Sequence, residues 1–425
     1  METANHPQPC SRRTILSHAL AGSGGLMAGM LVPPAHAAPN SEPPGAFFNV
    51  RGFGAAGDGQ TDDTAAAQTA INAALKAGGG CVHFPPGRYR ITRSLLLGSA
   101  DRIDITGDGW TSALLHENNE HLLLWKEGTA CRECSVRDLA LLSTGTDKSA
   151  DVAAIACLGG AERSLFSHLL MKGDGARVGS GIVVEGVMDT TTLEHCLMWE
   201  ISGTGVKVAR GSEVRIFGGR IVGKDRYRDR SIGVHLTGDN GGVHIVTTDL
   251  IALNTALQIG ERGSKPNREV FLTHATLDSC IHGLVQMDGA YTSIAGCWAA
   301  SSDEEQILLD SSAEGAILVV SGGTIFNGGA LGRGGNHGLV VRAGSFVLSG
   351  VTVRSNKGTG ILVDGDAVRD YAVTGCRIAD NGVGAALKGD NYVFTSNVLA
   401  RNGQHLLDAG GPNKQVANNV LAVGK

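Results

Sequence analysis

Two aspartates, Asp288 and Asp310, are spaced as a pair of catalytic carboxylates would be on neighbouring turns of a coiled strand. If each holds the same outward position of its turn, their Cα atoms lie one strand spacing apart, about 5 Å. Two carboxyl groups at that separation suit the acid and the nucleophile of a glycosidase. The alternative interpretation is an acidic strip that only faces solvent, and the sequence leaves both open.

A second group of residues points to proton abstraction. His235 stands beside Lys207 in the same predicted row, and the Arg-rich segment 224–230, which includes Arg228, comes just before it. Cations that hold a sugar carboxylate acidify the neighbouring C–H bond, and an imidazole can then remove that proton. The alternative is an exposed histidine in a basic patch. The same rows supply the other predicted substrate-binding residues, Gln258, Gln286 and Arg342.

Strand alternation is the basis for these positions, because apolar residues two apart face the core and the residues between them face outward. A slip by one residue would bury Asp288 and Asp310 without partners, which costs several kcal/mol per charge. The predicted inward pairs are Ile182 and Val184, Val206 and Val208, Val234 and Leu236, Leu257 and Ile259, Val285 and Met287, Ile307 and Leu309, Leu339 and Val341. The predicted outward rows are Val183, Lys207, His235, Gln258, Gln286, Leu308, Val340, and Glu185, Ala209, Thr237, Gly260, Asp288, Asp310, Arg342, Asp364, Lys388.

A degenerate repeat of strands and tight corners runs from Asp108 to Asn419. About thirteen corners recur at intervals of about 21 to 31 residues. One such unit cannot bury its own apolar face, so stability must come from stacking on its neighbours. The 62 glycines and the 4% of aromatic residues suit frequent turns between short strands. We therefore predict an all-β fold, a right-handed parallel β-helix of about 12 to 13 coils.

The most specific motif is FNVRGFGAAGDGQTDDT at residues 48–64, followed by a predicted helix at 63–77 and by CVHFPPGRY at 81–89. This pattern resembles the N-terminal motif of the pectate-lyase superfamily, in its rhamnogalacturonase- and epimerase-like β-helix proteins and in phage tail spikes. The resemblance implies a polysaccharide ligand along one sheet face. The helix is expected to cap the first coil and cover its open edge. We assign Asp58, Asp62 and Asp63 to turns and caps rather than to catalysis.

Residues 1–37 are predicted to be a targeting signal. Ser11-Arg12-Arg13 followed by an apolar stretch and Ala35-His36-Ala37 resembles a twin-arginine export signal with its cleavage site, and a general secretory signal is the alternative. A linker at 38–46 then leads to a single domain at 47–425. The mature protein is expected in the periplasm or the medium, without a membrane span.

The net charge is −5, or near −6 without the two arginines and one glutamate of the predicted signal. A duplex nucleic-acid binder normally carries a basic surplus, so no nucleic-acid partner is expected. Eight cysteines follow Cys10, and we predict free, buried thiols, since Cys196, Cys297 and Cys376 share a corner column several coils apart. Neither metal site nor cofactor is predicted. Calcium occurs in lyases of the fold that the motif resembles, but no ligand cluster is evident.

Three classes of function remain open. The first is a carbohydrate-active enzyme, either a hydrolase using Asp288 and Asp310 or a lyase or epimerase using His235 and Lys207. The second is a polysaccharide-binding protein with the same groove and no catalysis. The third is a structural or adhesive β-helix. The sequence does not distinguish a monomer from a trimer.

Overall fold

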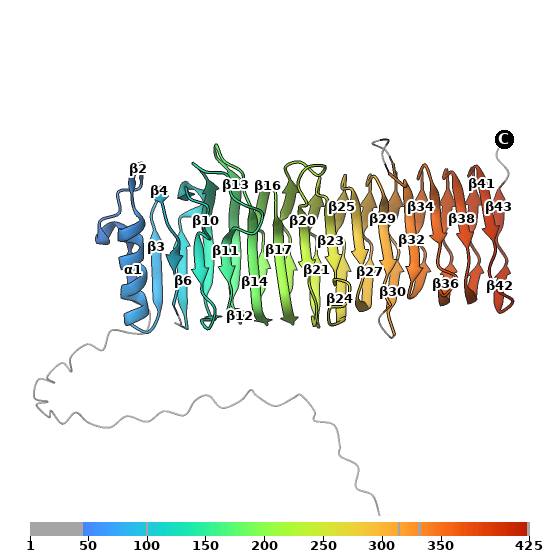
Figure 1. Cartoon of the computed structure of the whole chain (residues 1–425), viewed down its shortest axis with the longest axis horizontal. Coiled ribbons are helices and arrows are strands. Elements are labelled where there is room, and N and C mark those ends of the chain that lie inside the picture. The colour runs from blue at the N-terminus through green and yellow to red at the C-terminus, as the bar shows by residue number, and fades with distance from the viewer. Residues whose placement is uncertain (1–45, 99–100, 313–314, 330–331, 333, 423–425) are drawn as a thin grey trace, which may run out of the picture. The chain divides into compact units, whose positions relative to one another are not determined.

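A parallel β-solenoid of about 14 turns forms the described part of the chain (Figure 1). The computed structural model describes residues 46–422 except 99–100, 313–314, 330–331 and 333, and they belong to the compact unit Pro43–Lys425. Strands of successive turns pair in parallel. The predicted right-handed parallel β-helix is therefore confirmed, with about 14 turns rather than 12 to 13.

Two sheets build the solenoid. Sheet B, the smaller, has 15 strands: β5 (Leu95–Leu96), β8 (Leu123–Trp125), β9 (Cys131–Arg132), β11 (Ala153–Cys157), β12 (Gly160–Glu162), β14 (Ser180–Asp189), β17 (Thr204–Ser212), β20 (Ile232–Leu236), β23 (Thr255–Ile259), β26 (His282–Gln286), β29 (Glu305–Asp310), β32 (His337–Ala343), β35 (Thr359–Val363), β38 (Val383–Leu387) and β41 (Gln404–Asp408).

Sheet A, the larger, has 28 strands and bends around the corners to cover the remaining faces. They are β1 (Phe47–Asn49), β2 (Asp58–Asp62), β3 (Gly80–Phe84), β4 (Gly87–Ile91), β6 (Ile103–Gly107), β7 (Ser112–His116), β10 (Ser135–Ser143), β13 (Leu165–Gly173), β15 (Thr192–Glu194), β16 (Leu197–Ile201), β18 (Arg215–Phe217), β19 (Arg220–Gly223), β21 (Val243–Val246), β22 (Asp249–Ile251), β24 (Asn267–Thr273), β25 (Thr276–Asp278), β27 (Gly289–Ala295), β28 (Trp298–Ala300), β30 (Ile317–Ser321), β31 (Thr324–Phe326), β33 (Ser345–Ser349), β34 (Thr352–Arg354), β36 (Arg369–Thr374), β37 (Arg377–Ala379), β39 (Asp390–Thr395), β40 (Val398–Ala400), β42 (Lys414–Ala417) and β43 (Val420–Ala422). Two short 3-10 helices, η1 (Val50–Phe53) and η2 (Gly109–Thr111), lie near the N-terminal end.

Helix α1 (Thr64–Lys76) packs on the first turn, as the predicted capping helix should. The buried Asp63 carboxylate accepts the N–H groups of Ala56 and Gly57 at 2.6 and 3.0 Å. Asp62 accepts the N–H of Thr64 at 3.0 Å, which satisfies one donor of the first helical turn. These carboxylates have structural partners, as the sequence predicted.

Glycine fixes the register of the sheet B strands at two informative positions. A Cβ on Gly233 would lie 2.5 Å from the carbonyl oxygen of Ala256 on the next turn, and one on Gly283 would lie 2.1 Å from that of Gln306. The residue after each glycine, Val234 or Leu284, points into the core. In β20 and β26 a glycine therefore directly precedes the first core residue of the strand.

The register predicted for β26 is wrong by one residue. Leu284 and Gln286 face inward, and Val285 faces outward, where the sequence analysis placed Val285 and Met287 inside. Gln286 is fully buried, between Ile259 and Leu309 of the neighbouring turns. The apolar pattern misled the prediction because Gln286 occupies a core position that is normally apolar.

The eight described cysteines are all free, and seven of them are buried. Cys196, Cys297 and Cys376 hold equivalent corner positions, since each thiol contacts the carbonyl oxygen two residues earlier at 3.5 to 3.6 Å. This agrees with the predicted corner column. Within the described residues, no helix is long and apolar enough to cross a membrane. The predicted signal at 1–37 and nearly all of the linker at 38–46 lie outside the described residues.

Candidate functional site

One outward row of sheet B runs in continuous register across its turns. Lys207 of β17 pairs with His235 of β20, which pairs with Gln258 of β23, and the row is apolar on both sides of these three. The full row is Leu96, Leu124, Ala156, Val183, Lys207, His235, Gln258, Val285, Leu308, Val340, Leu362, Ala386 and Leu407. The predicted row is confirmed from Val183 to Val340 except at one position, where Val285 takes the place predicted for Gln286.

His235 is the buried polar group of this row, with 7% of its surface exposed. Its Nε2 atom lies 3.2 Å from Oε1 of Glu261, without a hydrogen-bond partner among the described residues. Burial lowers the pKa of His235, the nearby Glu261 carboxylate raises it, and Lys207 lowers it, with a net result below the ordinary value. The imidazole is therefore neutral at neutral pH and can accept a proton.

A cavity of about 270 Å³ opens beside this histidine. Lys207 and Arg230 line it together with His235, so two cations and a neutral base share one small space, with the carboxylates of Glu185 and Asp151 also in the lining. Lys207 is paired with Glu185 at 2.7 Å, whereas Arg230 has no ion-pair partner in the described part of the chain. An unpaired guanidinium in such a cavity suits a ligand carboxylate.

The loop that follows β23 contacts both predicted catalytic aspartates. Asp310 is paired with Arg262 at 2.6 Å, and Asp288 accepts the N–H of Gly263 at 2.8 Å. Glu261 of the same loop reaches His235, so three adjacent loop residues contact the three predicted catalytic groups. The loop brings the predicted residues into one neighbourhood, although both aspartates already have partners.

The predicted pairing of Asp288 and Asp310 on neighbouring strand positions is wrong. Gln286 pairs with Leu309, so the register carried one residue further places Met287 beside Asp310. The cause is the one-residue slip of β26 described above. The side chain of Asp310 is largely shielded from solvent, with 15% of its surface exposed.

Three predicted substrate-binding residues have different outcomes. Gln286 is wrong as a surface group, because it lies in the core and donates to the carbonyl oxygen of Gly289 at 3.2 Å. Arg228 lines a separate cavity of about 830 Å³ with Arg177 and Lys224, rather than the space beside His235. Arg342 is exposed on β32, three turns beyond Gln258.

The sequence analysis missed Glu261 and Arg262 as contacts of the candidate site. Neither belongs to a repeating strand, so alternation gives them no orientation. The only signal in the sequence was that two charged residues directly follow Gly260 at the end of a predicted strand. Arg230 was named only as a member of the Arg-rich segment. No group of three or more His, Cys, Asp or Glu residues in the described chain is arranged to hold a metal ion.

The architecture places the chain in a fold class, the right-handed parallel β-helices. A family profile described as rhamnogalacturonase A/epimerase, pectate lyase-like, matches residues 47–124. The match covers the capping helix and the first turns, the part of the chain that carries the motif at 48–64.

Known relatives add a local sequence similarity. Alginate lyase 7 of Azotobacter vinelandii is 62% identical over 45 residues, which make up 11% of this chain and 5% of that protein. Mannuronan C5-epimerase AlgE4 of the same bacterium is 56% identical over 45 residues, 11% of this chain and 8% of that protein. The matching segment thus spans less than a tenth of the length of these relatives.

Solved structures extend the similarity of fold to most of the chain. The A-module of mannuronan C-5 epimerase AlgE4 from Azotobacter vinelandii has a TM-score of 0.57 at 15% identity, covering 88% of this chain and 100% of that one. The family 28 exopolygalacturonase of Yersinia enterocolitica has a TM-score of 0.51 at 13% identity, covering 89% and 79%. At these identities the comparison shows the fold alone.

Proposed function

We propose that this protein acts on an acidic polysaccharide and removes the C5 proton of a uronate residue, as a lyase or a C5-epimerase. The observation that carries the proposal is the neutral, buried imidazole of His235 beside Lys207 and Arg230 in one cavity. Relatives of the N-terminal segment are named as an alginate lyase and as mannuronan C5-epimerases, and both reactions begin with this proton transfer.

The chemistry follows from the charges around the cavity. Arg230 and Lys207 bind the uronate carboxylate and stabilise the negative charge that develops on it when the C5 proton leaves. His235 accepts that proton as general base. In an epimerase a water molecule reprotonates the carbanion from the opposite face of the ring, and the proton on His235 returns to solvent. In a lyase the electron pair forms a C4–C5 double bond and expels the glycosidic oxygen at C4, which takes up a proton from the His235 imidazolium or from water.

A hydrolase using Asp288 and Asp310 is the second candidate. The short loop that contacts both carboxylates and His235 favours it, because it keeps the two aspartates in one neighbourhood. Two observations argue against the hydrolase. Asp310 forms an ion pair with Arg262, and Asp288 does not pair with Asp310 on the neighbouring strand. We therefore rank proton abstraction first.

The test compares variants on uronate polymers such as mannuronan. His235→Ala should lower turnover on the order of 10²- to 10⁴-fold, the usual effect of losing a general base. Lys207→Gln should raise KM as well as lower kcat. His274→Ala, an exposed change at a corner of sheet A, serves as the control that keeps activity, and Asp288→Asn tests the second candidate.

The products separate the remaining classes. Ultraviolet absorbance of unsaturated uronate indicates a lyase, and changed C5 configuration without cleavage indicates an epimerase. Reducing ends without absorbance, abolished by Asp288→Asn, would support the hydrolase instead. Binding without any product would leave a non-catalytic binding protein, and neither binding nor product would leave a structural or adhesive one. We further propose a periplasmic or secreted location, which rests on the sequence of residues 1–37.

A further inference from the structure

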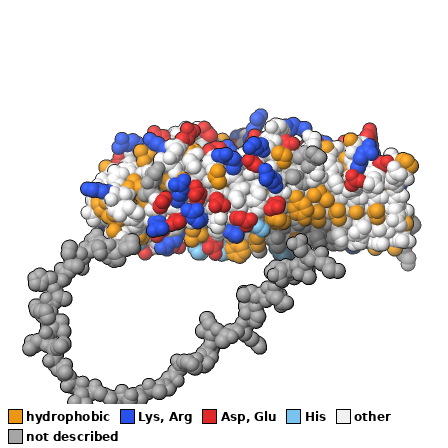
Figure 2. Space-filling model, turned by 90° about the horizontal axis from the view of Figure 1, so that it is seen from below, with side chains coloured by type: hydrophobic (Ala, Val, Ile, Leu, Met, Phe, Trp, Pro, Cys, Tyr) orange, Lys and Arg blue, Asp and Glu red, His pale blue; other side chains and the backbone are white. Residues whose placement is uncertain are grey.

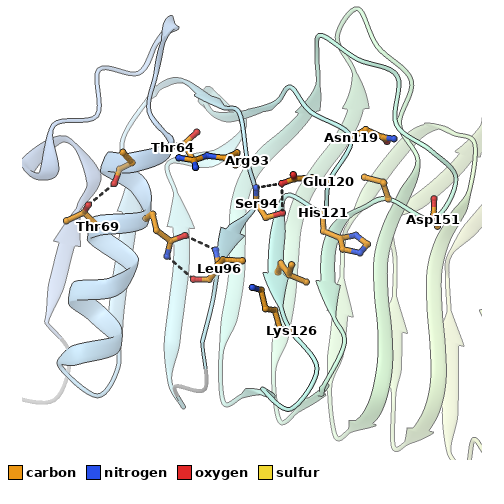
Figure 3. A pocket seen from close by; sticks show the side chains of 14 residues that line it. Thr64, Thr69, Arg93, Ser94, Leu96, Asn119, Glu120, His121, Lys126 and Asp151 are labelled. Carbon is orange, nitrogen blue, oxygen red and sulfur yellow. Dashed lines mark hydrogen bonds between the residues drawn. The ribbon is translucent and has the colours of Figure 1, made fainter.

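A third cavity lies at the N-terminal end of sheet B (Figure 3). It has a volume of about 830 Å³ and is walled on one side by α1, through Thr64, Gln68 and Thr69. Leu96 of β5 and Leu124 of β8 form an apolar floor, which a sugar ring could cover.

This cavity belongs to the same outward face as His235. Leu96 and Leu124 are the first members of the row that continues to Lys207 and His235. Asp151 lines both this cavity and the one beside His235, so a ligand along the row would pass from one to the other. Four strand steps separate Leu124 from His235, a distance of about 19 Å.

Two cations in the cavity lack partners. Arg93 and Lys126 make no ion pair and no side-chain hydrogen bond with any residue that the structure describes. In Figure 3 both lie on the α1 side of His121 and Asp151, and Lys126 directly follows β8. Two free cations over an apolar floor match a sugar that bears a carboxylate.

Neutral and acidic groups complete the lining. His121 accepts the N–H of Ala153 at its Nδ1 atom at 3.0 Å, and burial lowers its pKa, so its Nε2–H is available as a donor. Glu120 accepts the N–H and the hydroxyl of Ser94 through Oε2, at 3.2 and 3.3 Å. Its Oε1 atom and Asp151 remain as acceptors for sugar hydroxyl groups.

We propose that this cavity is a distal subsite that binds a carboxylated sugar residue of the glycan whose reacting residue lies at His235. The inference rests on the proposed function for the nature of the ligand, but its own residues are separate from the reacting cavity apart from Asp151. Arg93 and Lys126, at different ends of the cavity, each offer a positive charge to carboxylates of the glycan. Leu96 and Leu124 support a ring, and His121 and Glu120 orient hydroxyl groups. The subsite lowers KM for glycans that are long enough to span both cavities.

The experiment measures KM and kcat for mannuronan oligomers of graded length with the double variant Arg93→Gln/Lys126→Gln. We expect KM for long oligomers to rise at least about tenfold, because two charge-assisted contacts are lost. Oligomers too short to span the two cavities should keep the KM of the unaltered protein, and kcat should be unchanged for all lengths. Arg377→Gln, an exposed change on sheet A, is the control and should alter neither constant.

Calorimetric binding to His235→Ala keeps this inference distinguishable from the proposed function. If no turnover is found but the double variant still weakens binding of long oligomers alone, the subsite stands and the proposed reaction fails. If turnover is found and the double variant binds every length normally, the subsite is wrong and the reaction stands. An equal loss for short and long oligomers, or no binding to the parent protein, also overturns the subsite. Circular dichroism confirms that each variant is folded.

Discussion

At the scale of single residues, His235 differs from an ordinary surface histidine because it is buried and has charged neighbours of both signs. Its burial lowers the pKa, Glu261 raises it and Lys207 lowers it. The neighbours therefore offer two independent ways to change the protonation of the imidazole without removing it. If His235 only supported the fold, changing its neighbours would not shift the pH dependence of turnover.

The first prediction concerns pH. Because the base must be neutral, kcat/KM should rise as the pH increases through the pKa of His235, which lies below 6.5. This rise forms the acid limb of the pH profile. Glu261→Gln removes a carboxylate that favours the imidazolium, so the acid limb should move to lower pH. Lys207→Gln removes a cation that disfavours it, so the limb should move to higher pH. Limbs that stay in place in both variants would contradict His235 as the base.

The second prediction concerns acid stability and His116, which is 3% exposed and hydrogen-bonded through Nε2 to the carbonyl oxygen of Glu120 at 2.5 Å. Burial lowers the pKa of His116 to about 4, against 6.5 in the unfolded chain. The unfolded chain takes up the proton first. The stabilising contribution is therefore complete above pH 6.5 and lost as the pH falls toward 4, by about 3 kcal/mol.

Urea unfolding at pH 7 and pH 4 measures this effect. His116→Gln keeps a donor near Glu120 but does not titrate, so its free energy of unfolding should fall less between the two pH values than that of the parent. Other groups contribute equally to both proteins. The same fall in both would show that His116 is not a source of the acid sensitivity.

At the scale of elements, the strands and corners could be predicted because they recur at similar intervals along the chain. The capping helix could be predicted from the segment that follows the motif at 48–64. Alternation placed Lys207, His235 and Gln258 correctly. It failed at β26 because Gln286 is polar in the core, while the glycine at 283 carried the correct register. Close approach of backbones on neighbouring turns was thus a better guide than hydrophobicity alone.

The loop after β23 shows what alternation cannot reach. Its conformation depends on which partners it meets across the surface, and Glu261 and Arg262 meet His235 and Asp310 only in the folded solenoid. The Arg-rich segment behaves likewise, since Arg230 faces the cavity and Arg228 does not. Positions set by long-range contacts left no period in the sequence.

The third prediction tests the corrected register of β26. Gln286→Met keeps the length of the side chain and removes an amide whose oxygen has no hydrogen-bond partner among the described residues. Stability should be unchanged or rise by about 1 kcal/mol, with normal turnover. Gln286→Lys should destabilise by several kcal/mol because it buries a charge. A stable lysine variant with impaired substrate binding would restore the outward position, and thermal denaturation with kinetics decides between them.

At the scale of the whole molecule, stacking of turns explains both the composition and the distribution of chemistry. Small residues fit the corners, and one contiguous core runs through the solenoid. Figure 2 shows most charged side chains of one face gathered over its N-terminal half, and a row of hydrophobic side chains across the C-terminal half. Both cavities that border the outward row of sheet B lie beside its earlier turns.

The fourth prediction concerns the cysteines. Cys81 is half-buried and the other seven described cysteines are buried, so in a chain carrying Cys10→Ser at most one thiol should react quickly with a thiol reagent. All eight should react after denaturation, since the stacked corners keep equivalent thiols apart. Fewer than eight after denaturation without reductant would reveal a disulfide and contradict the arrangement of the turns.

The fifth prediction follows the proton itself. Mannuronan incubated with the protein in deuterium oxide should lose the C5 proton signal in proton NMR spectra, either by exchange during epimerisation or by elimination. The account predicts this loss for the parent protein and its near absence for His235→Ala. Cleavage that leaves every C5 proton in place, or a loss of signal that persists in His235→Ala, would contradict the central claim that His235 abstracts the proton.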